Sequence, residues 1–560
     1  MNNQNLNLLV AIILSVAIMF GWQHFVERPK LQEKVIQTKE YNNVLNQAKE
    51  EQKNSDLIVS RENALIKDKR VTFENSHISG SINLTGLRID DLSFLKYKKD
   101  ARADSENVNL LVPNKTKDTY FAEFGWYSSN KDMALPDQNT LWEANSDSLH
   151  AGEFVTFSWN SPQNILFKVT MSLDEEYMFD LKHEVINNSS NTLSIQNYGL
   201  IYKTFDFEQN RMAVIHEGAS GVFNDELKEY PYKDMKDKKK IENKLGRISW
   251  CGITDKYWMV MLVPDQTINY TGNANFMIKN GLDRYQVDFI SSVQIVGPGS
   301  SLSLTHRLFG GVKELPILDA YEEKLQIKLF DRTIDFGWFY IITKPLLYVL
   351  HFFYSIVGNF GLSIMIVTVL VKLSMFSLAN RSYKSMKVMK ALAPQVDKIK
   401  TNCGDDKMRL NQEIMALYKT HKVNPLSGCL PLFIQIPVFF SLYKVLNVSI
   451  EMRHAPFFGW INDLSVPDPT NLFNLFGLVP FNPPSFLHIG VWPLLMALTM
   501  YLQQRMSPPA SDPVQAQMMK MMPLIFLFMF SGFPAGLLIY WTWNNILSIA
   551  QQAYINRSNA

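Results

Sequence analysis

The sequence predicts a multi-pass α-helical membrane core of five spans, plus an N-terminal anchor helix, with a large antiparallel β-sandwich domain between them. Residues 57–328 are mixed polar and contain short runs in which apolar side chains alternate, as in half-buried strands. Residues 336–554 are instead dominated by long apolar runs with few acids. A chain of 560 residues exceeds one ordinary domain, so two unlike parts are expected.

The amino end carries the first apolar run, at 6–25. A cleaved signal peptide would need a basic start and a small-x-small cleavage site, and neither is evident, so an uncleaved transmembrane anchor over 1–27 is favoured. Residues 28–56 are rich in Gln, Glu, Lys and Asn, which predicts a polar linker.

Residues 57–326 are predicted to form the β-sandwich domain. Apolar side chains alternate at 78–87, 167–171 and 178–185, and turn signals separate these runs. A carbohydrate-processing site would need paired acids in a cleft, but the acidic run 174–176 lies in a predicted turn. We interpret that run as solvated loop charge and expect no catalytic residues.

Residues 327–357 are predicted to include an amphipathic helix in the membrane interface, because the stretch 338–354 mixes aromatic side chains with Lys344, Pro345 and His351. The transmembrane core is predicted over 358–555. Its spanning runs are 361–378, 430–448, 486–502, a short 521–530, and 536–550.

The loop between the first two of these runs is strongly basic, with ten Lys or Arg against four acids. The positive-inside rule places it in the cytoplasm, which puts both termini inside and the β-domain outside. Residues 382–400 and 405–419 are predicted helices of a hairpin spanning 380–425. Its cations could bind anionic lipid, ribosomal RNA or a protein partner, or could simply set the topology; they include Lys384, Lys387, Lys390, Lys398 and Lys400.

Lys372 stands inside the apolar run 361–378. A lysine near the middle of a span costs roughly 2.5 to 3.5 kcal/mol, so its presence predicts a water-filled cavity, unless the side chain snorkels to the inner headgroups. Gln435 and Asn544 could keep such a cavity wet. Alternatively, Gln435 could satisfy carbonyls freed by nearby prolines, and Asn544 and Asn545 could join helices.

Several chemistries are not indicated. The net charge of +2 gives no argument for nucleic-acid binding. The three cysteines, Cys251, Cys403 and Cys429, show no metal-ligand spacing, and no phosphate-cradling Gly-x-x-x-x-Gly-Lys motif occurs. We therefore expect no metal, no cofactor and no enzymatic activity.

An ordered set of motifs then identifies a resemblance. They are Ile334-Asp335-Phe336-Gly337-Trp338, Gly404-Asp405-Asp406-Lys407, Asn424-Pro425-Leu426, Gly428-Cys429-Leu430-Pro431, Gln435-Ile436-Pro437, Trp460-Ile461-Asn462-Asp463-Leu464-Ser465, Met506-Ser507-Pro508, and Phe533-Pro534-Ala535-Gly536-Leu537 before Tyr540-Trp541. Together, over 334–552, they resemble the YidC/Oxa/Alb family. The anchor and β-domain before them resemble its Gram-negative form.

The resemblance implies a membrane protein insertase and folding chaperone of the bacterial inner membrane, with its β-domain in the periplasm. It would move hydrophobic segments of nascent membrane proteins from a hydrophilic, cytoplasm-open groove into the phospholipid bilayer, alone or with the Sec translocon. Ribosomal or signal-recognition components would be further partners. Lys372 falls where the family usually has arginine, Thr368 matches its groove threonine, and Tyr540 and Trp541 replace its tyrosine pair.

Two rival classes remain open from the residues alone. A secondary transporter or channel would also use an intramembrane cation and proline-broken helices, but it predicts internal repeats, and none is evident within the core. A structural docking protein would need only one anchor, so the further spans and Lys372 argue against it.

Overall fold

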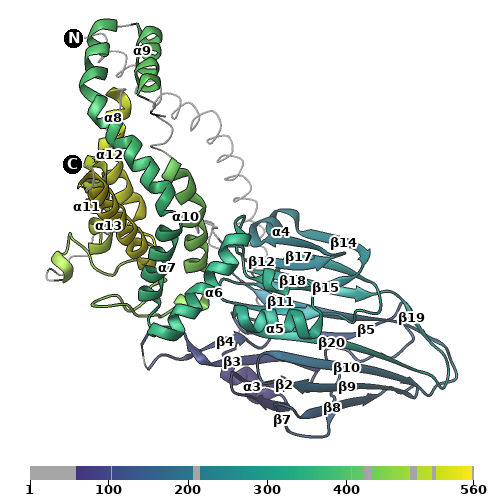
Figure 1. Cartoon of the computed structure of the whole chain (residues 1–560). Helices are drawn as coiled ribbons and strands as arrows, with labels where there is room; N and C mark the ends of the chain where they lie inside the picture. Colours follow the sequence, from purple (N-terminus) through teal and green to yellow (C-terminus); the bar gives the residue numbers. More distant parts are fainter. Residues whose placement is uncertain are drawn as a thin grey trace.

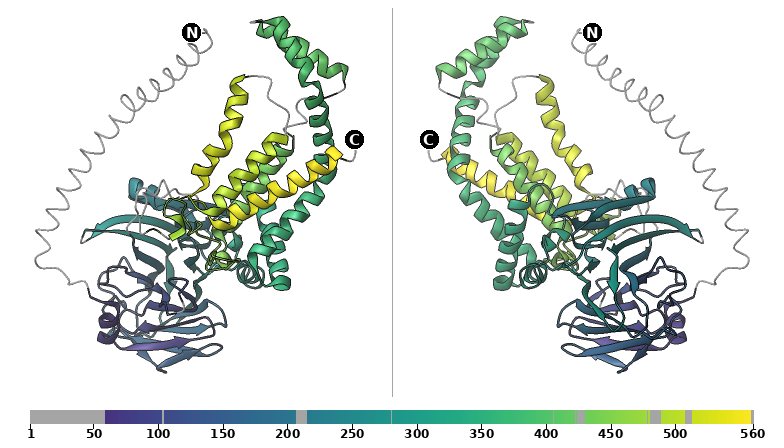
Figure 2. Two further views of the ribbon diagram at one scale, coloured as in Figure 1. Left: turned by 90° about the vertical axis from the view of Figure 1, so that its left-hand side faces the viewer. Right: turned by 90° about the vertical axis from the view of Figure 1, so that its right-hand side faces the viewer.

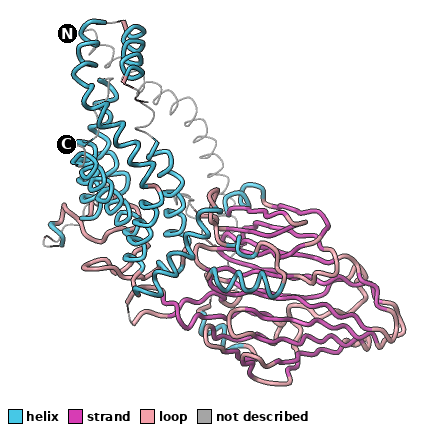
Figure 3. The backbone as a smooth tube through the Cα atoms, in the orientation of Figure 1, coloured by secondary structure: helices cyan, strands magenta, loops and turns pink. Residues whose placement is uncertain are grey.

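The computed structural model describes residues 59–557 except 103, 206–214, 280, 405, 422, 424–429, 478, 480–488 and 507–512. The predicted anchor (1–27) and linker (28–56) lie outside the described residues, as does the start of the predicted span 486–502. The strands gather in one part of the molecule and the long helices in the other (Figures 1 and 3).

The first sheet has eleven strands and is antiparallel except where β1 pairs with β7. Its path runs β14 (Lys240–Gly246), β17 (Tyr270–Lys279), β18 (Leu282–Ser291), β11 (Leu193–Thr204), β5 (Tyr120–Tyr127), β3 (Arg88–Lys98), β2 (Ile78–Asn83), β1 (Arg70–Glu74) and β7 (Ser148–His150); β19 (Gln294–Val296) pairs with β11, and β4 (Asn107–Leu111) with β3.

The second sheet has nine strands. Its order is β13 (Glu226–Pro231), β12 (Gly218–Phe223), β15 (Ile248–Thr254), β16 (Trp258–Val263), β20 (Ser301–Val312), β10 (Met178–Asn187), β9 (Ile165–Leu173), β8 (Phe154–Asn160) and β6 (Glu143–Ala144).

Side-chain alternation explains how the two sheets pack against each other. Every second residue of β9, from Ile165 to Leu173, is buried, and β11 shows the same pattern. The buried side chains of both sheets belong to one continuous hydrophobic cluster, so the β-domain is a sandwich.

Short helices flank the sandwich: α3 (Arg61–Lys67), α4 (Tyr232–Lys238), α5 (Leu315–Leu325) and the 3-10 helix η3 (Phe330–Thr333). The helical part contains α6 (Tyr340–Val357), α7 (Phe360–Ser374), α8 (Phe376–Cys403), α9 (Lys407–Thr420), α10 (Leu430–Val448), η5 (Ile450–Met452), η6 (Leu475–Gly477), α11 (Val491–Met506), α12 (Pro513–Phe530) and α13 (Ala535–Arg557).

The prediction of one continuous span over 361–378 was wrong. Helix α7 ends at Ser374, and the chain bends by 68° into α8. The Ser374 hydroxyl and the Met375 N–H both donate to the Val371 carbonyl, which is the kind of side-chain competition that bends helices. Lys372 therefore lies in the last turn of α7 rather than near the middle of a span.

The stretch 338–354 was predicted to form an amphipathic helix in the membrane interface, and α6 is a continuous helix of 18 residues. Pro345 lies in its second turn, where it removes a single backbone hydrogen bond. By length and composition α6 is the one helix of the described ranges that passes a membrane-span test alone, and the bent pair of α7 and α8 passes it together.

Helix α12 is also longer than predicted, at 18 residues from Pro513 to Phe530. Its segment Ala516–Phe530 is an apolar helix shorter than the 18 residues that the span test requires. The turn between α12 and α13 is tight, since α12 ends at Phe530 and α13 begins at Ala535.

Two polar contacts join the sandwich side to α10 and to the segment after it. The Lys444 ammonium on α10 lies 2.7 Å from the Asp335 carboxylate, which also accepts the backbone N–H of His216. Burial alone would raise the pKa of Asp335, but the hydrogen bond and charge of Lys444 hold it below its ordinary value. Arg453, after α10, donates to the Lys99 carbonyl at 2.8 Å.

The sandwich core contains two buried histidines, His183 on β10 and His306 on β20, whose rings lie 5.1 Å apart. Burial lowers the pKa of His306 to about 3 and lowers that of His183 well below its ordinary value. Both therefore stay neutral in the folded domain at pH values where an unfolded chain would protonate them.

We predict that the β-domain loses stability as the pH falls below about 6.5, because the unfolded chain then binds protons that the folded domain excludes. At pH 4.5 the loss from His306 should be about 2 to 3 kcal/mol, and His183 should add to it. Denaturant titrations of the full chain in detergent, followed by β-sheet circular dichroism, would measure it.

The variant His306→Phe should flatten this dependence by about half, because it removes one of the two titrating rings. The same change at His150, which is exposed, provides the matched control and should leave the slope unchanged. If the free energy of unfolding of His306→Phe depended on pH as in the unmodified chain, the assignment of this dependence to the buried histidines would be contradicted.

Candidate functional site

Lys372 lies where α7 meets α13. Its ammonium donates to the Ser548 hydroxyl at 2.8 Å, and Ser548 in turn donates to the Asn544 carbonyl at 2.8 Å. The Tyr383 hydroxyl of α8 also hydrogen-bonds with Ser548. The structure thus brings Lys372 and Asn544 together through Ser548, which the sequence reasoning missed. Helical spacing could have found it, because Ser548 lies one turn after Asn544 on the same face.

Thr368 lies one turn before Lys372 but turns inward. Its side chain is only 2% exposed, and its hydroxyl donates to the Ile364 carbonyl of the same helix at 2.6 Å. The hydroxyl is therefore satisfied within α7, so Thr368 contributes shape to this region more than hydrogen-bonding capacity.

Gln435 of α10 and Tyr540 of α13 form a second polar pair, in which the Gln435 amide donates to the Tyr540 hydroxyl. Tyr540 is buried, whereas Gln435 is half-buried. This contact joins α10 to α13, and it gives the amide a partner other than the proline-freed carbonyls.

Asn545 donates to the Thr499 hydroxyl of α11 at 3.2 Å and is buried. It therefore acts as a link between α11 and α13, which was one of the two roles considered for this asparagine pair. Asn544 is also buried, at the α7 side of α13.

Trp541 lies apart from Lys372. Its ring packs 4.7 Å from Phe439 and 4.9 Å from Phe530 between ring centroids, with Phe526 at 5.8 Å. The structure therefore places Trp541 in an aromatic cluster between α10, α12 and α13, while its neighbour Tyr540 contacts Gln435.

Burial along the helices is uneven. In α7 every buried residue lies between Phe360 and Thr368, and none lies between 369 and 374. In α10, whose side chains are described from 435 onward, the buried residues begin at Ser441, and none of 435–440 is buried. The described parts of α7 and α10 are thus packed firmly at the β-domain end and loosely toward the other end, where Lys372 lies.

The two helices predicted for 382–400 and 405–419 correspond to α8 and α9, which project from the loosely packed end, away from the β-domain (Figure 2). Asp406 caps α9 by accepting the Arg409 N–H. Lys384, Lys390 and Lys398 are exposed, and Lys387 and Lys400 are half-buried. Lys400 lies 3.9 Å from Asp397.

One group of acids, Asp319, Glu322 and Asp331, could geometrically hold a metal ion. The Lys344 ammonium of α6 lies 2.8 Å from Asp319 and 2.7 Å from Asp331, so a cation of the chain already sits between two of these carboxylates. The arrangement ties α6 to the sandwich.

Among solved structures, an active YidC insertase with its first transmembrane domain resolved overlaps 88% of this chain and 93% of its own, at 17% identity and a TM-score of 0.36. A galactose mutarotase-like protein from Lactobacillus casei overlaps 43% of this chain and 99% of its own, at 12% identity and a TM-score of 0.30. Neither likeness is strong enough to carry an argument.

Sequence comparisons are far more specific. The family model described as "YidC periplasmic domain" matches residues 70–349, and the one described as "60Kd inner membrane protein" matches residues 352–560. The membrane protein insertase YidC of Rickettsia felis is 53% identical over 563 residues, covering 100% of both chains. Those of Rickettsia rickettsii and Rickettsia bellii are 53% identical over 562 and 561 residues, with the same coverage. The chain therefore belongs to the YidC family: it is a membrane protein insertase, not an enzyme, with a periplasmic domain built mainly of β-sheet.

Proposed function

We propose that the loosely packed end of the helices, around Lys372, is the hydrophilic groove through which the insertase receives its client. A client helix must bring a polar tail part-way into the bilayer, and bare hydrocarbon makes this costly. Water and one positive charge lower that cost, most of all for acidic tails. The observation that carries this proposal is the contact of Lys372 with a hydroxyl, Ser548, at the end where α7 and α10 cease to be buried.

The neighbouring polar groups support the same role. Gln435 and Tyr540 supply an amide and a hydroxyl between α10 and α13, and Asn544 lies on the turn that carries Ser548. We infer that these groups keep the groove hydrated, while Thr368 shapes its inner wall and Trp541 offers aromatic contact on the side of α12. No group in the groove needs to change covalently.

The short apolar portion of α12 suggests how the client leaves. Fifteen residues of helix cover about 22 Å, against a hydrocarbon core near about 30 Å. A locally thinned bilayer would follow. The apolar client segment then enters lipid, driven by burial of apolar surface at roughly 25 cal/mol per Å².

We propose six membrane spans with both termini in the cytoplasm: the anchor over 1–27 and the five helices α7, α10, α11, α12 and α13. The α8–α9 hairpin and the end of α13 lie at the opposite end of the helices from the β-domain (Figure 1), which supports a cytoplasmic location for both. The ten cations between 381 and 422 support the same side.

Helix α6 passes the length and composition test for a span, but its contacts favour the outer membrane interface. Lys344 binds acids of the sandwich, and His351, two turns later, lies 3.2 Å from Glu451 of η5. A helix whose polar side chains contact both the sandwich side and the segment after α10, over two turns, is expected beside the outer membrane face, so we retain the interfacial assignment.

The proposed domain limits are the anchor 1–27, linker 28–56, sandwich 57–326, interfacial segment 327–357 and core 358–555. Partners consistent with this arrangement are nascent inner-membrane proteins, the lipid bilayer and the Sec translocon. The exposed lysines of the hairpin, facing the cytoplasm, suit a ribosome or a signal-recognition component that delivers the client.

We predict that a cysteine at 372 reacts with a polar, membrane-impermeant maleimide much faster than cysteines at 368 or 370, with Cys251, Cys403 and Cys429 first replaced. Thiols react as thiolates, which require water. Thr368 is buried, and Leu370 is exposed on an apolar face, so it provides the matched control. Equal labelling at 370 and 372 would contradict a groove confined to the Lys372 face.

We also predict that Lys372→Ala lowers insertion of clients with acidic tails by roughly fivefold, as expected for losing about 1 kcal/mol of charge attraction at partial hydration. Clients with Asp replaced by Asn in the tail should change less than about twofold. Insertion into proteoliposomes containing the purified full chain would be scored by protease protection of the tail.

Lys372→Arg keeps the charge and should retain insertion of both clients. Equal loss for acidic and neutral tails in Lys372→Ala would refute the charge attraction. Solute flux through the same proteoliposomes, lost on mutation of Lys372, would instead favour the transporter interpretation.

A further inference from the structure

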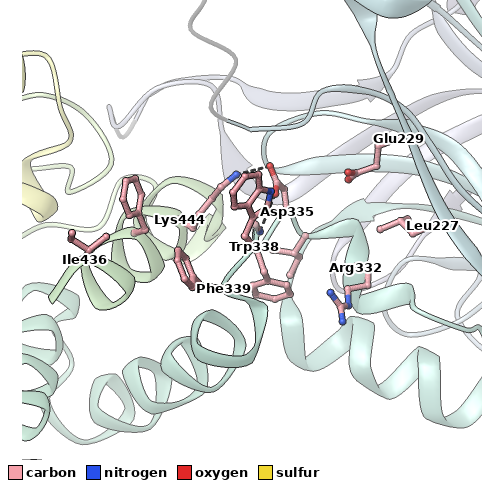
Figure 4. A pocket seen from close by; sticks show the side chains of 12 residues that line it. Leu227, Glu229, Arg332, Asp335, Trp338, Phe339, Ile436 and Lys444 are labelled. Carbon is pink, nitrogen blue, oxygen red and sulfur yellow. Dashed lines mark hydrogen bonds and ion pairs between the residues drawn. The ribbon is translucent and has the colours of Figure 1, made fainter. Parts of the chain in front are cut away.

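A cavity of about 720 Å³ lies between the sandwich and the helices, far from Lys372. It is bounded by β13, by the segment 332–339 that leads into α6, and by α10 (Figure 4). This volume falls within the range of about 300 to 1,000 Å³ typical of small-molecule sites. Nothing in the groove mechanism uses it.

The cavity has a polar end and an apolar end. Arg332 lies on the sandwich side in Figure 4, Ile436 lies on the α10 side, and Phe339 lies between them. On α10, Ile436 is two turns from Lys444, which places it about 12 Å further from the β-domain along the helix axis. The lining therefore becomes apolar in the direction that leads into the membrane.

Arg332 has donors to spare. Its guanidinium stacks over the Tyr340 ring at 3.2 Å, and its nearest acid is Asp331, 4.0 Å from Nε. The other oxygen of Asp331 is already taken by Lys344 and Tyr340. Among the described residues, none accepts a hydrogen bond from Arg332; its Nε is buried, so the two terminal nitrogens are the donors that a ligand can reach. Such a guanidinium matches a phosphate, which accepts two of its N–H groups at once.

The mouth of the cavity carries exposed apolar side chains. Trp338 is 100% exposed, and Phe440 and Ile436 of α10 are 48% and 40% exposed. Trp is enriched at the headgroup level of membranes. With the spans and orientation proposed above, on which this step rests, the cavity opens to the outer leaflet of the bilayer.

We propose that this cavity binds a phospholipid of the outer leaflet, with its phosphate on Arg332 and one acyl chain running past Phe339 and Phe440 to Ile436. The lipid fills the wedge between the periplasmic domain and α10. Its binding is independent of the client groove at Lys372, so either assignment can fail without the other.

A polypeptide fits the cavity less well than an acyl chain. An extended segment would leave backbone groups without partners along the apolar part of the lining, beside Phe339, Phe440 and Ile436. An acyl chain is narrow and has no such groups, so the polarity of this part of the lining favours lipid.

The test uses the purified full chain in vesicles of one part phosphatidylglycerol to four parts phosphatidylcholine. A photoreactive group in one acyl chain of the phosphatidylglycerol labels the protein, and labelled peptides are identified by mass spectrometry. We expect labels at Phe339, Phe440 and Ile436. Arg332→Gln should reduce them roughly tenfold, as for loss of a charge-assisted hydrogen bond, and should leave labelling elsewhere unchanged.

Arg307→Gln is the matched control, because Arg307 lies on β20 of the same domain and pairs with Asp180, outside the cavity; its labelling should equal that of the unmodified chain. Ile436→Trp narrows the apolar end without altering charge and should also reduce labelling. If thermal melting shows that Arg332→Gln does not fold, the labelling of Ile436→Trp tests whether the cavity binds the lipid.

Three results would overturn the proposal. Labelling could be unchanged in a folded Arg332→Gln variant or, where that variant does not fold, in Ile436→Trp. A phosphate-free diacylglycerol carrying the same photoreactive chain could label these residues equally, which would indicate only contact with bulk lipid. A cysteine at 440 could crosslink efficiently to residues 1–58 of the same chain or to a client, which would identify a polypeptide occupant.

Discussion

The high cost of a charge in hydrocarbon governs how this chain is built. Lys344 and Lys444, on α6 and α10, lie against carboxylates of the β-domain side, and those contacts attach the helices to the sandwich. Lys372 instead lies against a hydroxyl, Ser548, at the other end of the bundle. Lys344 and Lys444, which are paired with carboxylates, therefore stabilise the contact between the helices and the sandwich. Lys372, whose partner is a neutral hydroxyl, suits a hydrated path for a client.

Much of the fold could be predicted because its signals are local and periodic. The alternation at 167–171 and 178–185 became β9 and β10, since burial of one face imposes a period of two. The predicted apolar runs on either side of Pro534 became α12 and α13, and the two predicted hairpin helices became α8 and α9, which separate at Gly404. The ordered motifs identified the family.

What could not be predicted depends on competition between nearby groups. The bend after Ser374 arises because a hydroxyl and an N–H share one carbonyl, and an apolar run gives no sign of this. Similarly, Tyr540 and Trp541 are adjacent, yet one contacts Gln435 and the other joins an aromatic cluster, because successive helical residues point about 100° apart. Only the packing of α10 and α12 determines which side each one contacts.

The uneven burial along α7 and α10 has a mechanical consequence. Helices fixed at one end behave as stiff levers, so small rotations at the packed end become larger displacements at the free end. For a helix of 15 residues, about 22 Å long, a tilt of about 5° moves the free end by about 2 Å. The groove at the Lys372 end thus widens to admit client segments of different diameter. The contacts of α7 and α10 beside the β-domain are kept meanwhile.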